Sequence, residues 1–110
     1  MRQAEIRLLV ELDQDNIPEK IFWSASDSPT GGIEEAKAVH LSIWDHRRKE
    51  TMRIDLWTKD LPVDEMKQSV VDTIMSMAAT IRLATDDQLM AQYMEELGNK
   101  LLMHINHMHK

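Results

Sequence analysis

Three side chains in the middle of the sequence have the residue types of a hydrolase: His40, Ser42 and Asp55. His40 and Ser42 are two residues apart in an alternating strand pattern, so they point to the same face of a sheet. We expect Asp55, on the next strand, to share that face. A flat sheet face provides neither an oxyanion hole nor a dry pocket. The pattern therefore predicts no catalytic residue, and we expect a protein that is not an enzyme.

Histidines near the end of the sequence form a second candidate site: His104, His107 and His109. His104 and His107 are three residues apart, so they could share one helix face and bind one metal ion. No carboxylate or cysteine joins them in a recognisable motif. The alternative is a cationic helix end that complements the negative end of the helix dipole. We predict no cofactor and assign no metal ligand, and the spacing leaves metal binding by this cluster open.

The first part of the chain predicts a β-hairpin. Ile6, Leu8, Val10 and Leu12 alternate with polar residues, and Ile21, Trp23 and Ala25 continue the alternation after a turn cluster at 13–16. A four-residue loop at 13–16 places apolar residues opposite each other. That register also places Arg7 opposite Phe22 on the other face.

Two further strands are predicted at about 36–45 and 52–56, joined by a charged turn. Their core-facing residues are Val39, Leu41, Ile43, Met52, Ile54 and Leu56. A four-residue turn at 47–50 then places three pairs on the outer face, namely Trp44 with Arg53, His40 with Trp57, and Ser42 with Asp55.

The outer face of the predicted sheet is a candidate protein-interaction surface. Exposed Trp and Arg are typical anchors of protein interfaces. The alternative is cross-strand packing, with arginines lying over aromatic rings. The predicted interaction residues are Arg7, Phe22, His40, Trp44, Arg53 and Trp57. We expect this face to bind a protein partner or a second copy of the chain. A homodimer is the default, because a two-fold axis needs only one self-complementary patch.

The last part of the chain predicts two amphipathic helices. Pro62 suits the first helical position, and apolar residues recur at three- and four-residue steps over 63–81, which indicates a helix of about 23 residues. The segment 85–88 fits a capping box, so a second helix is predicted from there, with a kink favoured at Gly98.

The predicted fold class is α+β, with one domain over residues 1–110. Four antiparallel strands form a meander sheet, and the two C-terminal helices pack on one face of it, in the order β-β-β-β-α-α. The helices carry most of the nine methionines, which is typical of a loosely specified core or of a helix-mediated oligomer interface.

Charge and composition narrow the class of partner. The net charge of −6 argues against nucleic acid. No segment has the ~20 apolar residues of a membrane span, so we expect no direct membrane insertion. The N-terminus alternates instead of forming the apolar run of a signal peptide, and the chain has no cysteine. A cytoplasmic protein is therefore expected.

Several segments resemble the gliding motility-associated GldC family of Bacteroidetes. They are IPEKIFWSASD at 17–27, EAKAVHLSIWD at 35–45, MRIDLWTKDLPVDEMK at 52–67 and SMAATIRLAT at 76–85. The block at 52–67 is the most specific of them. Together with the opening strand they cover most of the chain, and the resemblance weakens after about Gln92.

The resemblance implies a small cytoplasmic accessory protein of the gliding machinery, which is coupled to protein secretion. It implies no enzymatic activity, no cofactor and no catalytic residue. A second resemblance is topological, because four meandering strands followed by two helices are similar to the export chaperone SecB. This analogy gives an alternative function, namely a chaperone or adaptor that binds unfolded or secreted client proteins.

Overall fold

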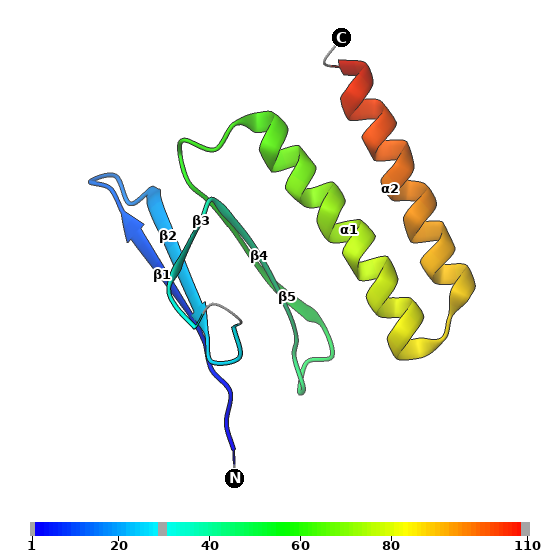
Figure 1. Cartoon of the computed structure of the whole chain (residues 1–110), viewed down its shortest axis with the longest axis horizontal. Helices are drawn as coiled ribbons and strands as arrows, with labels where there is room; N and C mark the ends of the chain where they lie inside the picture. Colours follow the sequence, from blue (N-terminus) through cyan, green and yellow to red (C-terminus); the bar gives the residue numbers. More distant parts are fainter. Residues whose placement is uncertain (1, 29–30, 109–110) are drawn as a thin grey trace. The chain divides into compact units, whose positions relative to one another are not determined.

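The computed structural model describes residues 2–28 and 31–108, and its contacts divide the chain into two compact units (Figure 1). The first, here called the strand unit, ends at Leu61. The second, here called the helical unit, begins at Pro62. Each unit is described by itself.

The strand unit contains five strands in two antiparallel sheets. The strands are β1 (Ile6–Leu12), β2 (Pro18–Ala25), β3 (Glu34–Ala36), β4 (Ala38–Trp44) and β5 (Thr51–Trp57). One sheet has the order β1-β2-β3, with β1 as an outer strand, and the other consists of β4 and β5 (Figure 1). The antiparallel α+β class is confirmed.

The predicted single four-stranded meander is wrong, because the strand expected at 36–45 is divided at Lys37. Before this residue the chain pairs with β2, and after it the chain pairs with β5. At the bend, the carbonyl of Lys37 accepts a hydrogen bond from the backbone N–H of Thr58 at 2.9 Å. The Lys37 ammonium also reaches Asp60 at 3.1 Å. The backbone hydrogen bond extends the β4–β5 ladder by one pair, and both contacts hold Lys37 to the segment after β5.

The helical unit is a pair of helices, α1 (Val63–Thr85) and α2 (Gln88–Met108). The 23-residue length predicted for the first helix is confirmed. Pro62 is the N-cap residue of α1 and not its first helical residue. The predicted capping box at 85–88 is also wrong. Thr85 still belongs to α1, and the carboxylate of Asp87 accepts the N–H of Met90 at 3.0 Å, as an N-cap does.

Close approach of the two helices depends on Gly98. This residue is buried within a continuous α2, so it does not end the helix. A Cβ added at Gly98 would overlap the Sδ of Met75 in α1 and lie 2.9 Å from its Cγ. Ala78 of α1 and Ala91 of α2 are also fully buried. Small side chains at these positions let the helices pack closely, and this explains the glycine better than a kink does.

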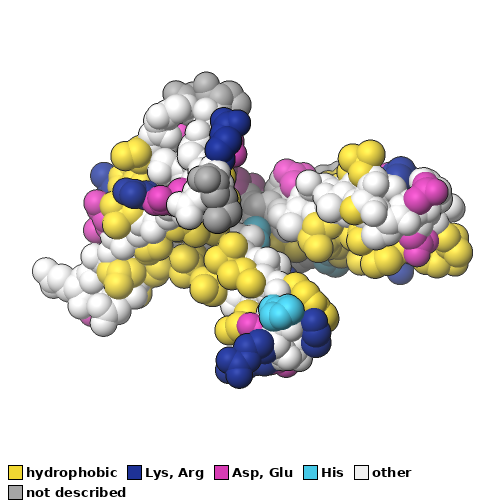
Figure 2. All heavy atoms as spheres, turned by 90° about the horizontal axis from the view of Figure 1, so that it is seen from below, with side chains coloured by type: hydrophobic (Ala, Val, Ile, Leu, Met, Phe, Trp, Pro, Cys, Tyr) yellow, Lys and Arg dark blue, Asp and Glu magenta, His cyan; other side chains and the backbone are white. Residues whose placement is uncertain are grey.

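Apolar side chains remain on the surface of both units (Figure 2). In α1 and α2 they include Val63, Met77, Tyr93 and Leu97. Among the described residues, no helix is both long and apolar enough to cross a membrane. The SecB-like packing of the helices on one face of the sheet stays a prediction.

Candidate protein-interaction site

The β4–β5 hairpin presents one face that carries most of the predicted interaction residues. Its register pairs His40 with Asp55, Ser42 with Arg53, Trp44 with Thr51 and Ala38 with Trp57. Residues that pair directly share a face. We call this side of the hairpin the tryptophan face, defined by His40, Ser42, Trp44, Arg53, Asp55 and Trp57.

The predicted pairs across this face are wrong by two residues, because the turn begins one residue earlier than expected. The carboxylate of Asp45 accepts the backbone N–H groups of Arg47 and Arg48 at 3.1 and 2.6 Å. Lys49 closes the turn with a φ of 56°, and Asp45 N–H donates to the carbonyl of Glu50. A shift by two residues preserves the faces of a strand, so the predicted membership of the tryptophan face still holds.

A polar cluster occupies the centre of the tryptophan face. Asp55 Oδ1 lies 2.9 Å from Nδ1 of His40 and 2.7 Å from Nη2 of Arg53. The contact with His40 and then the positive charge of Arg53 hold the pKa of the Asp55 carboxyl below its usual range. The His40 side chain is 12% exposed, whereas Arg53 is half exposed. The cluster therefore fixes the central side chains and leaves the guanidinium accessible.

The two tryptophans lie near opposite ends of this face. Trp44 is 64% exposed and Trp57 is 51% exposed. Neither lies directly opposite a cationic side chain, so the predicted direct pairs of Trp44 with Arg53 and of His40 with Trp57 are absent. The face thus consists of an ordered polar centre with an accessible indole toward each end.

Arg7 and Phe22 lie in the other sheet of the strand unit. Arg7 is opposite Ser24, and Phe22 is opposite Leu9, so the predicted pairing of Arg7 with Phe22 is wrong. The turn is one residue longer than predicted, so that Leu12 pairs with Pro18, and a register irregularity between Glu11 and Leu12 adds a second residue. Arg7 is ion-paired with Glu5. The structure therefore brings four of the six predicted residues together on one hairpin and places Arg7 and Phe22 on a second sheet.

The possible hydrolase trio is assembled in part. His40 and Asp55 are in contact, but Ser42 lies across from Arg53. A cavity of about 300 Å³ adjoins Asp55, and it is lined by Ile17, Pro18, Leu56, Trp57 and Lys59, without His40 or Ser42.

The histidine cluster near the end of the chain is described in part. His104 and His107 lie in the last turns of α2, whereas His109 lies outside the described residues.

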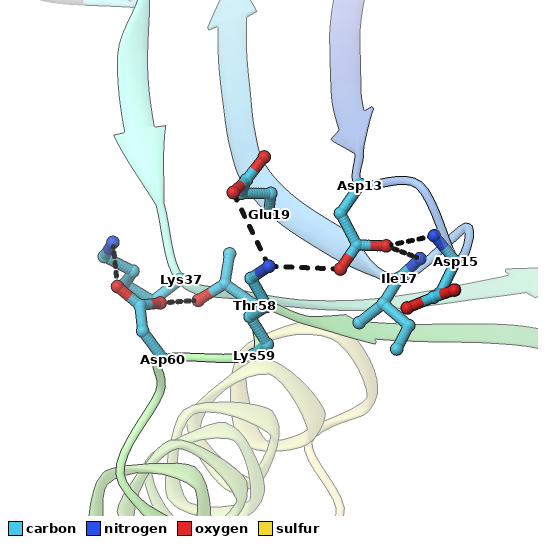
Figure 3. A network of polar contacts seen from close by, with 8 residues as sticks. All are labelled: Asp13, Asp15, Ile17, Glu19, Lys37, Thr58, Lys59 and Asp60. Atoms are coloured by element: carbon cyan, nitrogen blue, oxygen red, sulfur yellow. Dashed lines mark hydrogen bonds and ion pairs between the residues drawn. The ribbon is translucent and has the colours of Figure 1, made fainter.

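A polar network that the sequence pattern did not indicate connects the turn after β1 to the segment after β5 (Figure 3). The Lys59 ammonium lies 3.1 Å from Asp13 and 3.5 Å from Glu19. The other carboxylate oxygen of Asp13 accepts the N–H groups of Asp15 and Ile17. The backbone N–H of Ile17 and then the Lys59 ammonium hold the pKa of Asp13 below its usual range.

Asp60 anchors the second half of this network. Its carboxylate accepts the hydroxyl of the buried Thr58 at 2.6 Å and the ammonium of Lys37 at 3.1 Å. The Thr58 hydroxyl and then Lys37 lower the pKa of Asp60. The contact between Lys37 and Asp60 joins residues 23 positions apart, and sequence periodicity carries no signal for such a pair.

Comparison with protein families gives one match, to the family described as gliding motility-associated protein GldC-like, over residues 18–107. Comparison with the curated proteins and with the solved structures returns no match. The matched region begins at the first residue of β2 and extends through nearly all of α2, so it includes the whole tryptophan face. The chain therefore belongs to the GldC-like family, which is associated with gliding motility.

Proposed function

We propose that this protein is a non-enzymatic, cytoplasmic accessory component of the gliding motility machinery or of the secretion system coupled to it. It acts by binding another protein through the tryptophan face. The family membership supports the connection to motility. The observation that carries the binding role is the pair of accessible indoles, Trp44 and Trp57, on either side of an ordered polar cluster.

The chemistry of this face suits a protein partner. Tryptophan and arginine are the residue types most enriched among the side chains that dominate binding energy. Because Asp55 contacts both His40 and Arg53, little side-chain entropy remains to be lost there on binding. Arg7 and Phe22 belong to a separate sheet, so they lie outside the tryptophan face, and we assign them no part in this interface.

The experiment is cross-linking and affinity capture from a native host that expresses the tagged chain. Trp44→Ala combined with Trp57→Ala should abolish capture of a motility or secretion component. The matched control is Ile43→Ala combined with Met52→Ala, because this directly paired couple lies on the opposite face of the same hairpin. Equal capture by wild type and the tryptophan variant would contradict the proposal. Unfolding of the tryptophan variant would instead place the indoles in the core.

A second candidate is a chaperone or adaptor that binds unfolded or secreted clients. The half-exposed apolar side chains of the helices, including Met77, Tyr93 and Leu97, favour it. A chaperone of this kind should suppress aggregation of several unrelated unfolded proteins at stoichiometric ratios. Capture of one motility component without any suppression of aggregation would favour the accessory role.

A further inference from the structure

The outer edge of β1 is long, apolar and without a strand partner of its own in the described part of the chain. β1 pairs with β2 on one side, and the sheet order places nothing on its other side (Figure 1). The strand has seven residues, IRLLVEL, with neither proline nor lysine, and its two charged side chains are of opposite sign, Arg7 and Glu11. Natural edge strands normally carry proline or lysine, or are very short, because an open edge can pair with another strand.

The other edge of the same sheet is protected in this usual way. β3 has three residues, and two of them are Glu34 and Glu35. In the second sheet, the segment after β5 is already engaged at one end, where the N–H of Lys59 donates to the carbonyl of Pro18 at 3.1 Å. Within the three-stranded sheet, this contrast marks the edge of β1 as the unprotected one.

The backbone geometry shows which residues of β1 face outward. The N–H of Ser26 donates to the carbonyl of Glu5, so Glu5 points toward β2. Because backbone groups alternate in an antiparallel pair, Arg7, Leu9 and Glu11 also point toward β2. The outward N–H and C=O groups therefore belong to Ile6, Leu8, Val10 and Leu12.

The sequence of β1 is complementary to itself when two copies run antiparallel. If Leu9 lies on a two-fold axis, Arg7 of each copy is opposite Glu11 of the other. On the opposite face, Leu8 is opposite Val10 and Ile6 is opposite Leu12. In this register the four outward-facing residues are the ones that exchange backbone hydrogen bonds.

Registers shifted by two residues lose this match. One shift places Glu5 opposite Glu11 of the second copy. The other places Leu9 opposite Glu11 and Arg7 opposite Asp13, which lies beyond the end of β1 and is already ion-paired with Lys59. Like charges directly opposite each other are destabilising.

Leu9 is 59% exposed, and a hollow of about 540 Å³ adjoins the strand, with Ile6, Leu8 and Leu9 among its lining residues.

We propose that two copies of this chain pair through β1 about a two-fold axis at Leu9, which joins their three-stranded sheets into one continuous six-stranded sheet. The occupant of the open edge is thus a second copy of the chain. This interface differs from the tryptophan face, so its test is independent of the proposed function.

The first experiment measures association by sedimentation equilibrium of the full chain. Wild type should be a dimer. Arg7→Glu or Glu11→Arg should each raise the dimer dissociation constant roughly tenfold or more, because two-fold symmetry applies each repulsion twice. The double variant Arg7→Glu with Glu11→Arg should restore wild-type affinity. A monomeric wild type, or a double variant that stays as weak as the single ones, would overturn the proposal.

The second experiment uses the absence of cysteine from the chain. Leu9→Cys should form an intermolecular disulfide under mild oxidation, because residues facing each other across the axis have Cα atoms within bridging distance. Glu11→Cys is the matched control, since its two copies would lie roughly 14 Å apart along the strands. A dimer that cross-links through Glu11→Cys as readily as through Leu9→Cys, or through neither, would exclude this register. Circular dichroism of each variant verifies the fold.

Discussion

Two regions of the molecule are held together by different kinds of contact. Charged and hydroxyl side chains make many of the contacts between the two sheets of the strand unit. Small side chains allow the two helices of the helical unit to pack closely. Asp13, Lys59 and Asp60 illustrate the first case, and Gly98 against Met75 illustrates the second. Polar contacts depend on protonation and on geometry, whereas close packing depends on volume. The two units should therefore be sensitive to different changes.

The largest effect is expected from filling the space at Gly98. Gly98→Val should lower the free energy of unfolding by about 1–3 kcal/mol, because the new side chain overlaps Met75. Urea unfolding followed by circular dichroism at 222 nm measures the change.

Two variants make this test specific. Asn99→Val is the control, because the neighbouring position on the same helix is exposed. Met75→Ala combined with Gly98→Val should recover part of the loss. If Gly98→Val and Asn99→Val unfold at the same urea concentration, close packing at Gly98 is not what holds the helices together.

A smaller effect, larger in the strand unit than in the helical unit, is expected from acid, because most of the carboxyls whose pKa is lowered lie in the strand unit. The pKa values of Asp13, Asp55 and Asp60 are all lowered in the folded state of the strand unit, whereas in the helical unit the contact with Arg82 lowers the pKa of Glu95. A carboxyl with a lowered pKa stabilises the fold above its unfolded pKa, near 4, and that stability is lost as the pH falls through the folded value. The strand unit should therefore lose stability as the pH falls below about 4.

Spectroscopy can separate the two units in this experiment, because all three tryptophans, Trp23, Trp44 and Trp57, lie before residue 61. The urea midpoint of tryptophan fluorescence should fall further at acid pH than the midpoint of ellipticity at 222 nm. Asp13→Asn should reduce this pH dependence, with Asp15→Asn on the same turn as the control. A single midpoint for both probes at every pH would contradict the difference between the units.

The smallest effect is expected at the ion pair between the helices. Arg82 donates to both carboxylate oxygens of Glu95, at 2.8 and 3.1 Å, and to the side chain of Gln88. Both partners are about one-third exposed, so solvent and salt screen the attraction. Glu95→Gln should lower the urea midpoint slightly at low salt and not at high salt, unlike the control Glu96→Gln. If Glu95→Gln lowered the urea midpoint as much as Gly98→Val does, the expected order of effects would be wrong.

The sequence predicted the elements of this fold better than their partners. Alternation identified the strands β1, β2, β4 and β5, and helical spacing identified α1 with its length. The strand face predicted to lie in the core is largely exposed, as at Ile43, Met52 and Ile54. Both hairpin registers were wrong by two residues. Each turn depends on one aspartate, Asp13 or Asp45, whose carboxylate accepts backbone N–H groups, and on one residue with positive φ, Asn16 or Lys49. Such local contacts leave no periodic signal.

The candidate site shows the same difference: the sequence predicted which residues share a face but not which of them are in contact. Because the registers moved by two residues, the residues of the tryptophan face kept their side of the strand while their neighbours changed. The contact of Asp55 with both His40 and Arg53 could not be read from the predicted register. The division of the strands into two sheets occurs at Lys37, where the chain stops pairing with β2 and begins to pair with β5, and no local pattern could indicate this change of partner.

The hydrogen bond between Lys59 and Asp13 also has a consequence for the order of folding. It joins residues 46 positions apart, whereas the strand pairs within each hairpin are much closer in the chain. Closing a long loop costs more chain entropy than closing a short turn. During synthesis, β1 and β2 can pair long before Lys59 leaves the ribosome. We therefore expect this contact to form after the hairpins, so that a nascent strand unit passes through a stage in which its two sheets exist but are not yet joined.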